Sequence, residues 1–133
     1  MSKIQRALKY FINLFWGIIF LLFASVQFND PDPAIWIFTY TMTAIFCFVY
    51  LKTDWVQRLK WLYLVASMAL LIGSLLQFPP QWEGFGTEMK TENNELARES
   101  IGLLLCGLVV LIQFFYIKRS NYNKFNISYF RKR

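Results

Sequence analysis

The sequence predicts an all-α membrane protein, a bundle of four transmembrane helices with both termini in the cytoplasm. Of the 133 residues, 56% are hydrophobic and only 17% are charged, whereas charged residues make up about a quarter of typical soluble domains. Four runs of 18 to 22 residues contain no charge at all, and about 20 apolar residues suffice to cross a bilayer. These runs are apolar on all faces, whereas a soluble bundle would show a polar stripe along each helix.

The distribution of charge predicts the orientation. Of the 14 basic residues, twelve lie in the N-terminal segment, in the 52–60 loop and after residue 117, and seven of the eight acidic residues lie on the opposite side. Because basic residues favour the cytoplasmic side, we expect a multi-pass protein of the inner (plasma) membrane with the N- and C-termini inside. The net charge of +6 is therefore explained without a nucleic-acid partner.

The first predicted hairpin contains spans at about residues 9–28 and 34–51, joined by an acidic turn. The first apolar run is too long for a cleaved signal peptide and three more runs follow, so we expect it to stay in the protein. In the turn, Asp32 is expected to cap the second span, with Pro33 at its first helical position, the arrangement that both residue types prefer.

Two aromatic residues of the second span share one face of the predicted helix. Trp36 is expected at the outer membrane interface, where aromatic belts are found. Tyr40 lies one turn further on the same face, and its hydroxyl needs a partner if it is buried. We therefore expect this face to look into the bundle.

The second hairpin is predicted to contain spans at about residues 61–78 and 98–117. The short loop 52–60 that precedes it is expected to be a cytoplasmic helical turn. Pro79 ends the third span because proline supplies no backbone amide and clashes with the preceding turn. Asn94 is expected to cap the fourth span.

The transmembrane domain is predicted to cover residues 1–119, followed by a cytoplasmic tail at 120–133. The tail is basic and aromatic, a mixture that suits the surface of an anionic inner leaflet, so the lipid bilayer is its expected partner. Cys47 and Cys106 fall within spans at different depths, and a disulfide between them is not expected. Both are expected to be buried free thiols.

The sequence contains no recognisable catalytic or cofactor motif. It has no histidine, which excludes Ser-His-Asp and Cys-His catalysis and imidazole metal sites. It also lacks a Cys-x-x-Cys pair, a phosphate-binding glycine loop and a complete EF-hand. We therefore predict no cofactor and no catalytic residue.

A layer of polar side chains at the outer ends of the spans is the candidate site. The outer ends of helices joined by short loops converge, so residues distant in sequence are expected to be neighbours there. The candidate ligand-binding residues are Gln27, Asn29, Asp30, Tyr40, Gln77, Arg98 and Glu99.

Several interpretations of this layer remain open. In a structural interpretation, Asp32 caps a helix and Asp30 pairs with Arg98. In functional ones, Asp30 and Glu99 bind a divalent cation, since such ions prefer oxygen ligands, or Arg98 binds a lipid headgroup. A carboxylate could also serve a lipid-modifying enzyme. We favour a non-enzymatic membrane component that binds a small ligand or a membrane-protein partner through this layer.

Two motifs carry a resemblance to a known family. The turn Gln27–Pro33 is followed by Trp36 and Tyr40, and the stretch Glu95–Leu103 contains Arg-Glu-x-x-Gly-Leu. Together they resemble the transmembrane protein 220 family, although Ala97 stands where the family has a glycine. The resemblance implies a small multi-pass membrane protein and no particular activity. The richness in Phe, Ile, Lys and Asn suggests a bacterial member.

Overall fold

The computed structural model describes residues 3–29, 32–83 and 91–130, with the side chains of these residues except at 29, 53–55 and 118–130. In the described part there are helices and no strands, so the predicted all-α class is confirmed. The helices are α1 (Lys3–Val26), the 3₁₀ turn η1 (Gln27–Asn29), α2 (Pro33–Val49), α3 (Thr53–Arg58), α4 (Lys60–Leu76) and α5 (Glu92–Phe130).

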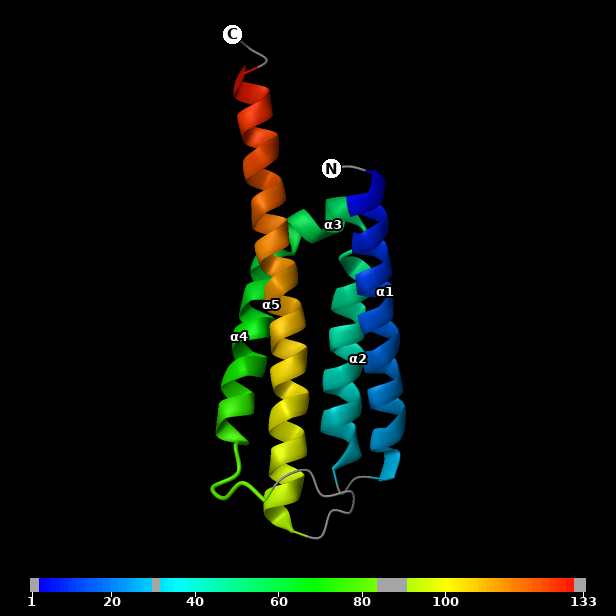
Figure 1. Cartoon of the computed structure of the whole chain (residues 1–133), viewed down its shortest axis with the longest axis vertical. Coiled ribbons are helices and arrows are strands. Elements are labelled where there is room, and N and C mark those ends of the chain that lie inside the picture. Colours follow the sequence, from blue (N-terminus) through cyan, green and yellow to red (C-terminus); the bar gives the residue numbers. More distant parts are fainter. Residues whose placement is uncertain (1–2, 30–31, 84–90, 131–133) are drawn as a thin grey trace.

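The long helices form two hairpins (Figure 1). α1 packs chiefly against α2, and α4 packs chiefly against α5. The short helix α3 connects the hairpins at the end of the molecule where the N-terminus lies, and α5 extends beyond that end. We call this the terminal end, and we call the opposite end, with η1 and the segment after α4, the loop end. Both chain termini therefore lie at the same end.

The helix bounds differ from the predicted spans mainly in α1 and α5. α1 begins at Lys3, and α5 begins at Glu92 and continues to Phe130. α1 and the 92–117 part of α5 are long and apolar enough to cross a membrane, whereas α2 and α4 are shorter apolar helices of 17 residues. A helix of that length spans about 26 Å, close to the lower limit for a transmembrane helix.

The outer surface of both hairpins is strongly apolar. Phe11 on α1, Phe38 on α2, Val65 on α4 and Ile112 on α5 are each more than half exposed, and many other large hydrophobic side chains are exposed beside them. Soluble monomers rarely expose large contiguous apolar surfaces. This surface is suited to contact with lipid tails.

Buried side chains form two clusters, one toward each end. The cluster toward the loop end contains Phe20, Trp36 and Tyr40 together with both cysteines. Cys47 and Cys106 are buried free thiols, as the sequence predicted. The cluster toward the terminal end surrounds Tyr63, which is fully buried.

Polar contacts join the two hairpins across the core. The amide nitrogen Nε2 of Gln113 on α5 donates to Asn13 Oδ1 on α1 at 2.8 Å and lies 3.3 Å from Cys47 Sγ on α2. The hydroxyl of Tyr63 on α4 donates to the backbone oxygen of Phe46 on α2 at 2.7 Å. Hydrogen bonds between helices contribute to association in membranes, where no hydrophobic effect drives it. These contacts therefore fix one hairpin against the other.

Small residues bring α4 and α5 close together. The Ser100 hydroxyl on α5 donates to the backbone oxygen of Ser74 on α4 at 2.8 Å. A Cβ atom added to Gly107 would lie 2.8 Å from Cγ of Leu71 on α4. Small residues at such positions allow transmembrane helices to approach closely, so α4 and α5 form one tightly packed unit.

Candidate functional site

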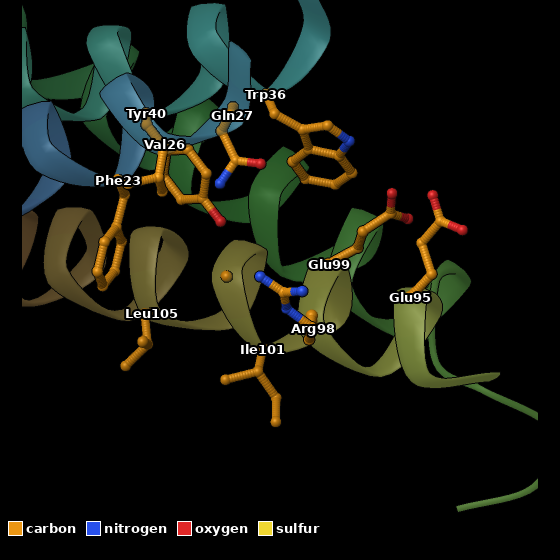
Figure 2. Close-up of a pocket in the computed structure, with 11 residues that line it drawn as sticks. Phe23, Val26, Gln27, Trp36, Tyr40, Glu95, Arg98, Glu99, Ile101 and Leu105 are labelled. Atoms are coloured by element: carbon orange, nitrogen blue, oxygen red, sulfur yellow. The ribbon is translucent and has the colours of Figure 1, made fainter. Parts of the chain in front are cut away.

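A pocket of about 290 Å³ lies at the loop end, between the end of α1, η1, α2 and the first turns of α5 (Figure 2). Its polar lining consists of Gln27, Tyr40, Glu95, Arg98 and Glu99. Its apolar lining comes from Phe23 and Val26 on α1 and from Ile101 and Leu105 on α5, and Trp36 and Gly102 complete the wall. The pocket therefore combines segments that are about 70 residues apart in sequence.

Four of the seven candidate residues from the sequence meet at this pocket. Gln27, Tyr40, Arg98 and Glu99 line it. Gln77 does not line it and instead follows α4, where its backbone N–H donates to the oxygen of Gly73. Of the other two candidates, Asp30 lies outside the described residues, and the side chain of Asn29 is not described.

The start of α2 places the aromatic wall of the pocket. Asp32 precedes the helix and Pro33 begins it, as predicted, but the Asp32 side chain makes no capping hydrogen bond. It instead accepts a hydrogen bond of 3.1 Å from the indole Nε1 of Trp36. Asp32 is therefore the N-cap residue by position, as predicted, while its carboxylate pairs with the indole one turn later and not with the helix backbone.

The face of α2 that carries Trp36 and Tyr40 looks into the bundle, as predicted. The Trp36 side chain is only 5% exposed and belongs to the buried cluster with Phe20 and Tyr40. The bond to Asp32 satisfies the indole N–H, and the predicted depth of Trp36 at the outer membrane interface stays a prediction. Trp36 and Tyr40 lie one turn apart and present one aromatic face.

The start of α5 places the charged wall. The backbone N–H of Asn94 donates to the Thr91 hydroxyl at 3.3 Å. Thr91 therefore caps this helix, and the prediction that Asn94 caps it was wrong. Glu83 fixes the same turn, because its carboxylate accepts hydrogen bonds from Thr91 at 2.6 Å and from Asn93 at 2.9 Å. These two bonds hold the pKa of Glu83 below its ordinary value.

Glu95, in the first turn of α5, lines the pocket beside the predicted residues Arg98 and Glu99. Glu95 was missed as a site residue, although its spacing of four from Glu99 places both carboxylates on one helix face. Figure 2 shows these two side chains pointing the same way, toward the α2 side of the pocket.

Gly102 is required where α5 passes Tyr40. A Cβ atom added to this glycine would collide with the Tyr40 hydroxyl and lie 3.2 Å from the ring carbon that bears it. The glycine therefore lets the phenol reach the α5 backbone and places the Tyr40 hydroxyl in the pocket wall. The sequence signal was the small residue three positions after Glu99.

The charged residues of the pocket limit what it can bind. Two carboxylates and one guanidinium line it, which gives a formal charge of −1. Among the described residues, no group of three or more Asp, Glu, His or Cys side chains is arranged to hold a metal ion. The lining therefore offers carboxylate oxygens as hydrogen-bond acceptors, one guanidinium group, and apolar side chains further along α1 and α5.

Comparisons with known proteins give one match. A family model described as "Transmembrane family 220, helix" matches residues 19–115. No curated protein and no solved structure matches the chain. The matched residues include every residue that lines the pocket.

Proposed function

The chain belongs to transmembrane family 220, and from this premise we propose that it is a non-enzymatic membrane protein that binds an amphipathic small molecule in the loop-end pocket. The proposal includes four spans in the inner membrane of a bacterium, with both termini in the cytoplasm. The pocket would then open at the outer face of that membrane.

The proposed topology is supported by three observations. The apolar helices α2 and α4 have 17 residues each, long enough for short spans. Exposed hydrophobic side chains occur on all four long helices. Both termini lie at the same end, and that end carries most of the basic residues. Reporter fusions after residue 117 test this orientation. A reporter that works only in the cytoplasm is expected to be active there, and a reporter that works only outside the membrane is expected to be inactive.

One observation carries the proposed binding function: the pocket has a polar half and an apolar half, built from three separate segments. Ligand sites in proteins are mostly apolar, with a few convergent polar groups. At about 290 Å³, this pocket is at the small end of the usual range of roughly 300–1,000 Å³. It suits a headgroup-sized polar moiety with the start of an apolar chain.

The proposal is tested by filling the apolar half of the pocket. Leu105 lines the pocket, whereas its neighbour Leu104 is exposed on the outside of α5 and does not line it. Leu105→Trp is expected to abolish binding of a co-purifying lipid or small molecule, and Leu104→Trp is the matched control.

The readout is native mass spectrometry of the full chain purified in mild detergent. We expect a bound species of defined mass on the natural protein and on Leu104→Trp, and none on Leu105→Trp. A bare natural protein, or equal retention by both tryptophan variants, would contradict the proposed function. Far-ultraviolet circular dichroism confirms that both variants are helical.

A further inference from the structure

We propose that the pocket selects a headgroup that carries both an ammonium and a phosphate group, as in phosphatidylethanolamine. This inference rests on the proposed function and specifies its ligand class. It is carried by the mixed lining of the cavity, in which acidic, basic, aromatic and apolar side chains occupy different parts.

The acidic side of the pocket fits an ammonium group. Glu95 and Glu99 are one turn apart on α5 and point the same way in Figure 2. Side chains four residues apart on a helix have Cβ atoms about 5–6 Å apart. A charged N–H···O bond is about 2.7–2.9 Å long, so one ammonium can donate to both carboxylates. The adjacent Trp36 adds an aromatic wall, which also favours organic cations.

The same arrangement is poorly suited to a bare divalent cation. Calcium takes six to eight oxygen ligands, and the described lining reaches six only if both carboxylates bind through both of their oxygens together with the Gln27 amide and the Tyr40 hydroxyl. The guanidinium of Arg98 stands beside them and repels a metal ion. An ammonium group needs fewer hydrogen-bond acceptors than calcium needs oxygen ligands. It also carries one positive charge, whereas calcium carries two.

Arg98 fits the phosphate group. It is exposed, lies between the two carboxylates in the sequence of α5, and makes no ion pair with another residue in the described part of the chain. A guanidinium binds phosphate oxygens through paired hydrogen bonds. A zwitterionic headgroup therefore offers an ammonium to the carboxylates and a phosphate to the guanidinium, whereas an anionic headgroup offers a group that matches only Arg98.

The apolar part of the pocket continues in the direction that acyl chains would take. From Glu95 to Leu105, α5 advances by about 15 Å, from the charged mouth to Phe23, Ile101 and Leu105. Ile101 and Leu105 lie three and seven residues after Arg98, on one face of α5, so a lipid whose phosphate contacts Arg98 would lay the first part of its chain on these two side chains. The intact lipid and the free headgroup carry the same ammonium and phosphate groups, and the experiment below distinguishes between them.

The test measures lipid binding to the purified full chain by native mass spectrometry. Phosphatidylethanolamine and phosphatidylglycerol with identical acyl chains are added in turn. We expect the ethanolamine lipid to bind about tenfold more tightly, because two charge-assisted hydrogen bonds at a partly exposed site are worth roughly this factor. Free phosphoethanolamine is added as a competitor; displacement assigns recognition to the headgroup alone, and failure to displace assigns it to the intact lipid.

The double variant Glu95→Gln and Glu99→Gln is expected to lose the preference between the two lipids. Glu92→Gln is the matched control, since Glu92 is an exposed acid in the first turn of α5 that does not line the pocket. Arg98→Gln is expected to weaken binding of both lipids.

The outcomes separate this inference from the proposed function. If the natural protein binds both lipids equally, or if the double variant keeps the preference, the headgroup assignment is overturned while ligand binding stands. If neither lipid binds more tightly to the natural protein than to Leu105→Trp, the proposed function fails as well.

Discussion

The contact between Gln113 and Asn13 joins the two hairpins, and removing it has a calculable consequence. Gln113 is 3% exposed, and its Nε2 donates to Asn13 Oδ1 at 2.8 Å. The change Gln113→Leu keeps the approximate volume of the side chain and removes this bond. Asn13 keeps the bond of 2.8 Å from its Nδ2 to the Lys9 backbone oxygen, but its Oδ1 loses its partner.

The expected loss of stability follows from three contributions. An interhelical hydrogen bond in a membrane is worth about 0.6 kcal/mol on average and up to about 1.7 kcal/mol. Leaving Asn13 Oδ1 buried and unpaired costs about 1–3 kcal/mol more. The variant also removes Gln113 Oε1, a buried atom without a hydrogen-bond partner, and this offsets part of the cost. We therefore expect Gln113→Leu to lower the free energy of unfolding by about 1–2 kcal/mol.

A double-mutant cycle with Asn13→Leu isolates the pairwise contribution. Unfolding by dodecyl sulfate titrated into non-ionic micelles, followed by circular dichroism, gives the free energy of each variant. We expect a coupling of about 0.6–1.7 kcal/mol between the two positions. Ser74→Ala is the control partner, because Ser74 contacts Ser100, about 20 Å along α5 from Gln113. Additivity between Gln113→Leu and Asn13→Leu within about 0.3 kcal/mol would refute the interpretation.

Three further predictions concern packing and pH. Gly102→Ala is expected to lower stability by about 1–3 kcal/mol because its Cβ takes the place of the Tyr40 hydroxyl; adding Tyr40→Phe should restore part of the loss in the same dodecyl sulfate titration. Gly107→Ala is expected to cost a similar amount by pushing α5 away from α4, and an unchanged midpoint would contradict the close packing. Hydrogen bonds lower the pKa of the Glu83 carboxyl from 4.5. The stability that these bonds give to the folded state is therefore fully present above pH 4.5 and is lost as the pH falls through the folded pKa. Thr91→Ala should raise this pKa toward 4.5 in a carboxyl nuclear magnetic resonance titration, and no change would count against the bond.

Several features of the fold were predictable because each rests on a local property of the sequence. Charge-free runs predict apolar helices, since a charge inside a hydrocarbon layer is costly. Pro33 predicts the start of α2, because proline prefers the first helical turn. The grouping of Gln27, Tyr40, Arg98 and Glu99 followed from the convergence of helix ends, which needs no side-chain detail.

Other features depend on partners that no local pattern identifies. The indole N–H of Trp36 donates to the Asp32 carboxylate, a contact that the sequence analysis did not predict. The spacing of four between Asp32 and Trp36 was the available signal. Gln113 and Asn13 are 100 residues apart, and only the packing of the hairpins brings them together.

The start of α5 depends on a contact in the preceding loop. Asn94 was the predicted cap, whereas the helix begins at Glu92 after the Thr91 cap. The bonds of Glu83 to Thr91 and Asn93 hold this turn. Glu95 is helical with either cap, and it supplies the second described carboxylate of the pocket.

The central claim is that an amphipathic lipid occupies the loop-end pocket, and photo-cross-linking tests it most directly. A phosphatidylethanolamine analogue with a diazirine near the start of its acyl chain is reconstituted with the full chain, irradiated, and its adducts are mapped by mass spectrometry. The account predicts adducts concentrated at Ile101 and Leu105, which line the pocket, over Leu104 and Leu108, which are exposed on the outside of α5. Equal labelling of these four residues would contradict it.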